Sequence, residues 1–315
     1  MNANINITRN QAARGGSDLK SFISQRFFLA ARLKHSEATN FHPLILLNAI
    51  KNIIGDQRHN PSTLLLKEIE DLSRGKTVRE DDNTILNQVA KAGLGKSIFI
   101  MDMEDACQAG NLQLMEQEAA RLHWASENGS AALEILIELA LQDFEKNGIL
   151  AFHLQRACAF AGKNLKTWRF TRTLLIEMGK ESLPEPHLEK DLNPWIFMGK
   201  ILNIPQPHLW VKYSVALRLW QGEYTRAKGY RREISHWLDN LSLTGDFFDL
   251  TGKLNDLKSY VENGGTYFIK LGESLLKNET GEKLSAVEAL RYLANNCPRP
   301  ELRKVARAIE ILKEL

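Results

Sequence analysis

The chain has 315 residues, of which 43% are hydrophobic and 25% charged, an ordinary composition for a folded globular protein. Nine prolines, twenty glycines and the lack of any low-complexity tract exclude a disordered or fibrous chain. The three cysteines, Cys107, Cys158 and Cys297, lie far apart, which excludes a disulfide scaffold and a cysteine-built zinc site and favours a reducing compartment.

Residues 1–16 form an Asn-rich leader without the apolar run that a secretory signal peptide requires. The most apolar window, Ala131 to Leu141, is interrupted by Glu134 and Glu138, so we expect no membrane span and no membrane partner. We therefore expect a soluble cytoplasmic protein with a flexible N-terminal leader. A leaderless secretion signal in the same residues remains an alternative.

The net charge of +3 is unevenly distributed along the chain. Residues 1–78 hold 11 basic and 6 acidic side chains, residues 79–160 hold 6 and 13, residues 161–240 hold 13 and 8, and residues 241–315 hold 11 of each. An acidic segment between two basic ones can attract a charged partner, although solvated helix faces produce the same alternation.

Apolar residues recur at helical spacing along nearly the whole chain, as in Leu133, Leu136, Ile137, Ala140 and Leu141. The residues suited to helix starts are Ser17, Pro43 and Pro61-Ser62. The glycines suited to left-handed helix ends are Gly55, Gly75, Gly93, Gly129, Gly148, Gly162, Gly179 and Gly222. The one short apolar run of strand type, Ser97 to Met101, has a helical context. We predict an all-α fold of antiparallel helix hairpins stacked as a bundle or a short α-solenoid. The predicted helices cover residues 18–35, 43–54, 61–73, 80–92, 96–108, 111–127, 130–147, 149–161, 164–178, 194–202, 207–221, 223–240, 246–262, 265–277, 284–295 and 299–314.

One stretch has the composition of a connection. Residues 180–194 carry three prolines, six charged side chains and a histidine, and no helix can continue through Pro184 and Pro186. We predict a helical domain over residues 17–180, a Pro-rich connection over 181–194 and a second helical domain over 195–315. A long surface loop inside one continuous array is the alternative.

A local resemblance appears at the junction that reads Gln221-Gly222-Glu223-Tyr224, with Ala227 three residues further on. This junction resembles the turn between the paired helices of a tetratricopeptide repeat, in which Gly ends one helix, an acidic residue caps the next, and Tyr and Ala pack between them. The spacings of 52, 60 and 42 residues between similar glycines differ from the constant period of 34 that the family has. The resemblance is therefore to a divergent α-solenoid, and a generic helix-hairpin bundle would produce the same caps.

The resemblance implies a concave surface that binds a peptide or helix of another protein. The candidates for partner binding are polar or aromatic side chains on the inner helix faces, namely Trp168, Arg169, Arg172, Lys212, Tyr213 and Trp220. The alternative is that these side chains have ordinary core or surface roles.

The sequence contains only incomplete matches to cofactor-binding and metal-binding motifs. The stretch from Gly93 to Ser97 resembles the end of a phosphate-binding loop, but Ala90 occupies the position of the required glycine and no buried strand precedes it. Glu233 and His236 form a single Glu-x-x-His spelling, whereas a helical di-iron site needs a pair. We expect no cofactor and no metal.

Arg231 and His236 spell Arg-x4-His, which resembles the motif of the HEPN ribonucleases. That resemblance implies that Arg231 would hold the scissile phosphate while His236 moves a proton. The sequence departs from the family because Arg232 follows where a small polar residue is favoured.

Basic side chains also recur along several predicted helix faces, which would neutralise phosphates and make binding fall with salt. The candidates for nucleic-acid contact are Lys163, Lys166, Arg226, Lys228, Arg232, Arg303, Lys304 and Arg307. Overall, the sequence favours a helical protein-interaction module, such as an adaptor, a regulator or a chaperone-like component. A nucleic-acid-binding protein, or an RNA-cleaving version of it, is the alternative; the sequence does not indicate the oligomeric state.

Overall fold

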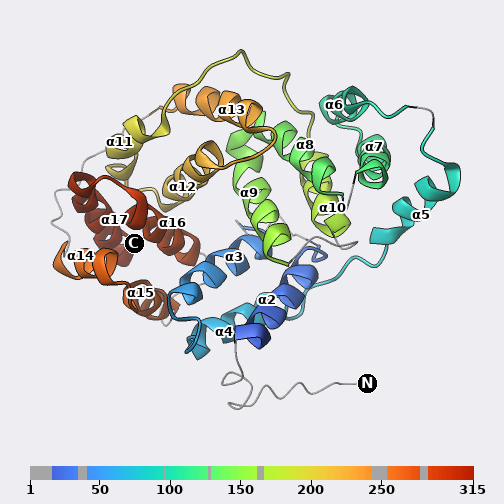
Figure 1. Cartoon of the computed structure of the whole chain (residues 1–315). Coiled ribbons are helices and arrows are strands. Elements are labelled where there is room, and N and C mark those ends of the chain that lie inside the picture. The colour runs from blue at the N-terminus through green and yellow to red at the C-terminus, as the bar shows by residue number, and fades with distance from the viewer. Residues whose placement is uncertain are drawn as a thin grey trace.

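A computed structural model describes residues 16–34, 41–95, 97–126, 129–161, 167–242, 254–276 and 283–315. Within these ranges the chain is built from α-helices and short 3-10 turns without any strand, so the predicted all-α fold is confirmed (Figure 1). A single isolated bridge pairs Leu33 with Val78. No helix in the described ranges is both long and apolar enough to cross a membrane.

The helices of the described ranges follow one another in chain order. Their bounds are α2 (Gly16–Ala30), α3 (Pro43–Ile54), α4 (Thr63–Asp71), α5 (Asp82–Ala92), α6 (Ile100–Gln108), α7 (Leu112–Ala125), α8 (Ser130–Leu141), α9 (Phe144–Ala161), α10 (Thr167–Met178), α11 (Met198–Leu202), α12 (Pro207–Gln221), α13 (Ala227–Asp239), α14 (Leu254–Asn263), α15 (Tyr267–Leu276), α16 (Lys283–Asn296) and α17 (Leu302–Glu314). Short 3-10 turns cover Gly55–Gln57, Pro194–Phe197 and Arg299–Glu301.

Several helix starts follow the predicted capping chemistry. The hydroxyl of Ser62 accepts a hydrogen bond from the backbone N–H of Leu65 at 3.2 Å, and Pro43 lies in the first turn of α3. α2 instead begins at Gly16, so Ser17 lies inside its first turn. Local sequence therefore sets the starts of α3 and α4, and exact bounds shift by a few residues.

Four of the glycines predicted as left-handed helix ends lack a positive φ, namely Gly55, Gly148, Gly179 and Gly222, and Gly162 lies outside the described residues. At Gly148 and Gly222 the reason is tertiary packing. Gly148 lies inside α9, where an added Cβ would stand 2.8 Å from the Phe144 ring, and the chain breaks earlier, between α8 and α9. Gly222 has φ −69° rather than a left-handed φ, and a Cβ there would overlap the ring of Tyr224. By contrast, Gly75, Gly93 and Gly129 have positive φ, as predicted.

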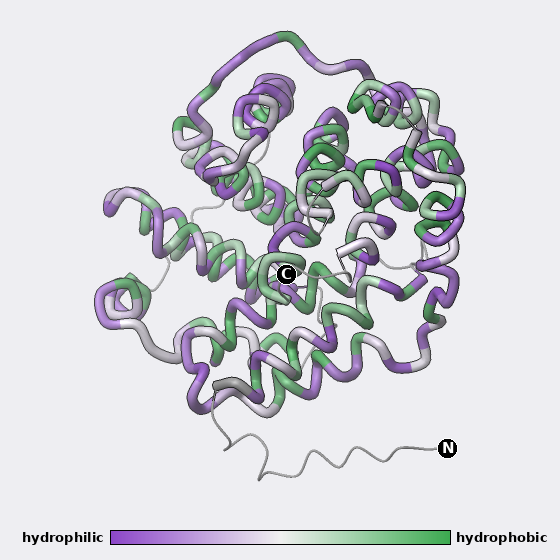
Figure 2. Tube along the Cα trace, turned by 45° about the vertical axis from the view of Figure 1, so that its right-hand side comes forward, coloured by the Kyte–Doolittle hydropathy of each residue, from purple (hydrophilic) through white to green (hydrophobic). Residues whose placement is uncertain are grey.

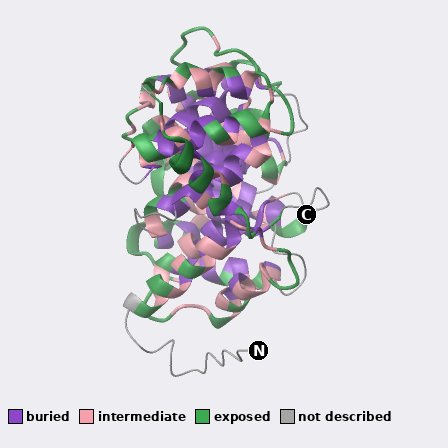
Figure 3. Cartoon of the chain, turned by 90° about the vertical axis from the view of Figure 1, so that its right-hand side faces the viewer, coloured by how far each residue is buried: buried purple, intermediate pink, exposed green. Residues whose placement is uncertain are grey.

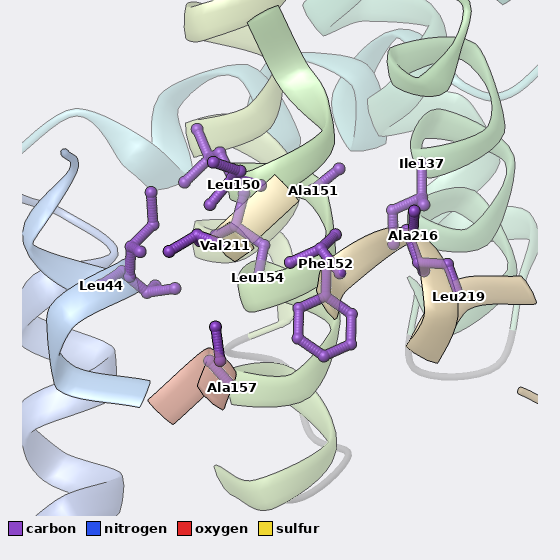
Figure 4. Packing of buried hydrophobic residues seen from close by; sticks show 14 of the residues in the cluster. Leu44, Ile137, Leu150, Ala151, Phe152, Leu154, Ala157, Val211, Ala216 and Leu219 are labelled. Carbon is purple, nitrogen blue, oxygen red and sulfur yellow. The ribbon is translucent and has the colours of Figure 1, made fainter. Parts of the chain in front are cut away.

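The core lies where α3, α9, α12 and α16 pack against one another, with α8, α10 and α13 adding further layers. Figure 4 shows Leu44 of α3, Phe152 and Leu154 of α9 and Val211 of α12 within this core. Polar and apolar residues alternate along most helices (Figure 2), which is the pattern expected of helices with one buried face. Cys107 and Cys158 are buried, and no disulfide forms among the cysteines of the described ranges.

The predicted halves share this core. α16 packs on α3 and α12 on α9, so helices from both sides of residues 181–194 contribute to one hydrophobic cluster. Residues 182–193 are extended and cross over α13 (Figure 1), where the backbone N–H of Leu192 donates to Ser235 Oγ at 2.8 Å. Figure 3 shows how buried and exposed residues are distributed over the molecule. We call residues 182–193 the strap. The connection is extended, as its prolines predicted, but it does not separate two cores.

Candidate binding surfaces

Two of the predicted partner-binding residues lie in the core. Trp168 is 1% exposed and its Nε1–H donates to the backbone carbonyl of Asp82 at 2.6 Å. Tyr213 is 0% exposed and its hydroxyl donates to the carbonyl of Pro194 at 3.0 Å. Both side chains join segments of the fold and offer no surface to a partner, which corrects their assignment as contact residues.

Two more of the predicted partner-binding residues are buried cations with carboxylate partners. Arg172 contacts Asp81, Asp82 and Glu116 at 2.8, 3.2 and 2.7 Å. Burial disfavours its charge, but hydrogen bonds to Asp81 and Glu116 outweigh that cost and raise the pKa of Arg172.

Lys212 pairs with Glu145 beside a cavity of about 180 Å³. Arg169 and Trp220 are half-buried, and the Trp220 Nε1–H donates to Asp191 at 3.2 Å. The six predicted residues therefore do not form one exposed concave face.

Arg231 and His236 lie on different sides of α13, because five residues of a helix correspond to about 140° of rotation. The Arg231 guanidinium donates to the carbonyl of Trp220 at 3.1 Å and lies 4.9 Å from the centre of the Trp220 ring. The ring of His236 stacks on His187 of the strap at 3.4 Å. Burial, and then the neighbouring His187, lowers the pKa of His236. Within this chain the structure does not bring the two groups together, and cleavage of RNA through them remains an untested prediction.

The three basic candidates from the α13 region line a cavity of about 310 Å³, where each meets a carboxylate. Arg226 and Arg232 contact Glu138, and Lys228 contacts Glu189 at 2.8 Å. The lining residues are Glu138, Glu189, Thr225, Arg226, Lys228, Gly229 and Arg232. Because these cations are neutralised in place, this cavity carries little net positive charge for a phosphate backbone.

The other basic candidates are dispersed. Lys304 pairs with Glu301 at 2.8 Å, Arg307 lies 3.5 Å from Asn203 Oδ1, and Arg303 is exposed. Figure 1 shows their helix, α17, on a different part of the molecule from α13. Lys163 and Lys166 lie outside the described residues.

A surface that the sequence analysis did not identify lies on the α6–α7 hairpin. Eight large hydrophobic side chains are exposed in the described ranges. Four of them lie on this hairpin or on the residue just before it, namely Phe99, Met101, Leu114 and Trp124. Phe99 and Met101 are 60% and 68% exposed. We call these four residues the docking face. Figure 1 places α6 and α7 at one edge of the molecule, away from the central helices.

Polar contacts hold the docking face in place. Arg121 of α7 donates to the backbone carbonyls of Leu94 and Ser97 at 3.1 and 2.8 Å, which fixes the loop that leads to Phe99. The Trp124 Nε1–H donates to the carbonyl of Leu86 at 3.1 Å, so its ring is anchored although 41% exposed. Exposed apolar side chains on a fixed backbone are typical of interaction sites.

The hairpin is also acidic. Residues 97–126 contain five carboxylates and one arginine. Asp105 is exposed, and the Asp102 side chain is 44% exposed beside Arg121. The sequence indicated the negative charge of this hairpin, because residues 79–160 form the acidic segment of the chain. It did not indicate that apolar residues of this segment are exposed.

No group of three or more His, Cys, Asp or Glu side chains is arranged to hold a metal ion anywhere in the described ranges.

Comparison with protein-family models, with curated proteins and with solved structures finds no match.

Proposed function

We propose that the protein is an interaction module, such as an adaptor or regulator, whose docking face binds a basic amphipathic segment of another protein. The observation that carries the proposal is the concentration of exposed apolar side chains on one acidic, anchored hairpin. Burying Phe99, Met101 and Trp124 supplies apolar area at the centre of an interface.

The carboxylates of the hairpin select the charge of the partner. Asp102 and Asp105 would lie at the rim of the interface, where they attract lysine or arginine side chains and disfavour acidic ones. Rim charges act mainly on association rate and specificity, so moderate salt should weaken binding without abolishing it.

A helical model peptide with leucine on one face and lysine on the other is a suitable probe, measured by isothermal titration calorimetry. The double substitution Phe99→Ser with Met101→Ser should weaken peptide binding about tenfold or more, since central apolar contacts dominate interface energies. A matching peptide with glutamate in place of lysine should bind more weakly than the lysine peptide.

The matched control removes exposed apolar side chains elsewhere, by Leu188→Ser with Ile196→Ser. These residues are 92% and 68% exposed, so the control variant should fold and bind the peptide like the parent. Equal weakening in both double variants, or none in the first, contradicts the proposal.

A further inference from the structure

Four basic side chains extend from the four central helices, and three of them lie along one face of α9, where Phe152, Arg156 and Phe160 follow one another at intervals of one turn. The Arg218 guanidinium lies 5.4 Å from the ring centre of Phe152, and the Lys51 ammonium lies 4.9 Å from that of Phe160. Lys51 extends from α3, Arg156 from α9, Arg218 from α12 and Arg291 from α16, and Figure 1 shows these helices meeting in the middle of the molecule. We call these four side chains the central cation cluster. The other three cations act on Lys51. Burial is the main reason why the pKa of Lys51 is lowered to about 8, and the positive charges of Arg156, Arg218 and Arg291 lower it further. The negative charge of Glu288 opposes this shift.

The carboxylates near the cluster are fewer than its cations, and each already has partners. Glu288 accepts hydrogen bonds from Arg218 and Asn52, both at 2.8 Å. Asp56 accepts hydrogen bonds from Arg291 and, at 2.8 Å, from the Tyr260 hydroxyl. These pairs leave two positive charges of the cluster unneutralised.

The two cations without a carboxylate are Lys51 and Arg156, neither of which forms an ion pair with another described residue. The Lys51 ammonium lies 4.9 Å from the ring centre of Phe160 and 5.9 Å from that of Phe27, in surroundings that do not replace its hydration. Arg156 is exposed at the side of the cluster.

Arg218 also retains an unused donor. Its guanidinium lies 4.1 Å from the ring centre of Tyr292, and its Nε–H is buried without a hydrogen-bond partner among the described residues. An unpartnered buried donor beside unpaired cations is costly unless an anion completes the arrangement.

We propose that the central cation cluster binds a phosphate-bearing anion. The charge supports this class of ligand, because a phosphate dianion matches the two positive charges left over. The donors support it too, since arginine and lysine are the side chains that bind phosphate oxygens best. The site is distinct from the docking face and does not depend on it.

Binding would change the protonation of Lys51. An anion close to its ammonium favours the charged form and raises the pKa of Lys51 from about 8 toward its ordinary value. The complex therefore holds the Lys51 proton more tightly than the free protein, and affinity falls as pH rises through about 8. The groups that face the Lys51 ammonium are Arg156, Arg218, Arg291, Glu288 and His153, together with the rings of Phe27 and Phe160.

The test titrates the full-length protein with pyrophosphate by calorimetry, at constant ionic strength set with chloride. Lys51→Met keeps the apolar stem beside Phe27 and Phe160 and removes the charge, and Arg156→Gln removes an exposed cation. Each should weaken binding about ten- to a hundredfold, as expected for loss of a charge-assisted contact. Lys270→Met, an exposed lysine on α15, is the matched control and should leave affinity unchanged.

The unfolding midpoint of each variant separates loss of the site from loss of the fold. Removing the Lys51 charge relieves repulsion from three arginines, so Lys51→Met should be at least as stable as the parent at neutral pH. A short RNA oligonucleotide in a second titration distinguishes the source of the phosphate, because Lys51-dependent binding of RNA points to a nucleic-acid backbone and binding of pyrophosphate alone to a small ligand. Failure of both probes to bind, or an affinity that Lys51→Met leaves unchanged, overturns the proposal.

Discussion

Replacing Asp82 by alanine is expected to lower the free energy of unfolding by about 3 to 5 kcal/mol, because it leaves the buried Arg79 without a carboxylate partner among the described residues and removes one of the three carboxylates that contact Arg172. Asp82 contacts Arg79 at 3.0 Å and Arg172 at 3.2 Å, and its side chain is 5% exposed. Arg79 also donates to the carbonyl of Ala31 at 2.8 Å, so the network joins the end of α2 to the start of α5 and the middle of α10. Urea unfolding followed by circular dichroism measures the loss.

The neighbouring residue provides the control. Asp81 contacts the same arginine, Arg172, at 2.8 Å, but its side chain is 63% exposed. Asp81→Ala should therefore cost under about 1 kcal/mol, as exposed ion pairs usually do. Similar losses for the two aspartates would mean that burial does not set the energy of this network.

Acidification should destabilise the protein through His153. This histidine is buried on α9, where the Asn48 side chain is hydrogen-bonded to its Nδ1 at 2.8 Å. Burial, which outweighs the opposing charge of Glu288, lowers the pKa of His153 to about 3.

The unfolded chain takes up the His153 proton near its ordinary pKa of 6.5, whereas the folded protein does not until about pH 3. The stability contributed by the neutral ring is therefore complete above pH 6.5. It is lost as pH falls from 6.5 to about 3, in total about 5 kcal/mol at about 1.4 kcal/mol per pH unit.

The measurement compares urea unfolding at pH 7.5 and pH 5.5, where one fully shifted histidine accounts for about 1.4 kcal/mol. His153→Gln should reduce the pH-dependent loss by that amount, although it also lowers stability at both values by disturbing the core. His59→Gln, at an exposed position, should leave the loss unchanged. A pH dependence that is the same in His153→Gln and the parent would show that His153 is not the group responsible.

Helical periodicity predicted the fold class because the spacing of apolar residues is a local property of each segment. The break between α8 and α9 was not predictable in this way, since Gly148 is needed for close approach to Phe144 rather than for a turn. Gly222 differs from its predicted role for the same reason, because the ring of Tyr224 occupies the space of a Cβ.

The binding residues were harder to predict, because a side chain's type does not show whether it faces inward. Trp168 and Tyr213 were assigned to a surface and lie in the core, whereas Phe99 and Met101 had no assigned role and are exposed. The partners of Arg172 are 56 to 91 residues away in the sequence, so no local pattern indicates that this cation is neutralised.

Cutting the strap should leave the two parts of the polypeptide associated. The residues of the strap are largely exposed, with Leu188 at 92%, while the helices before and after it interlock in one core. A protease that cuts near Leu188 should therefore give two fragments that stay together during gel filtration and separate only in denaturant. The same geometry makes the strap a natural place for new chain ends, so that two separately expressed fragments could reassemble as a split protein.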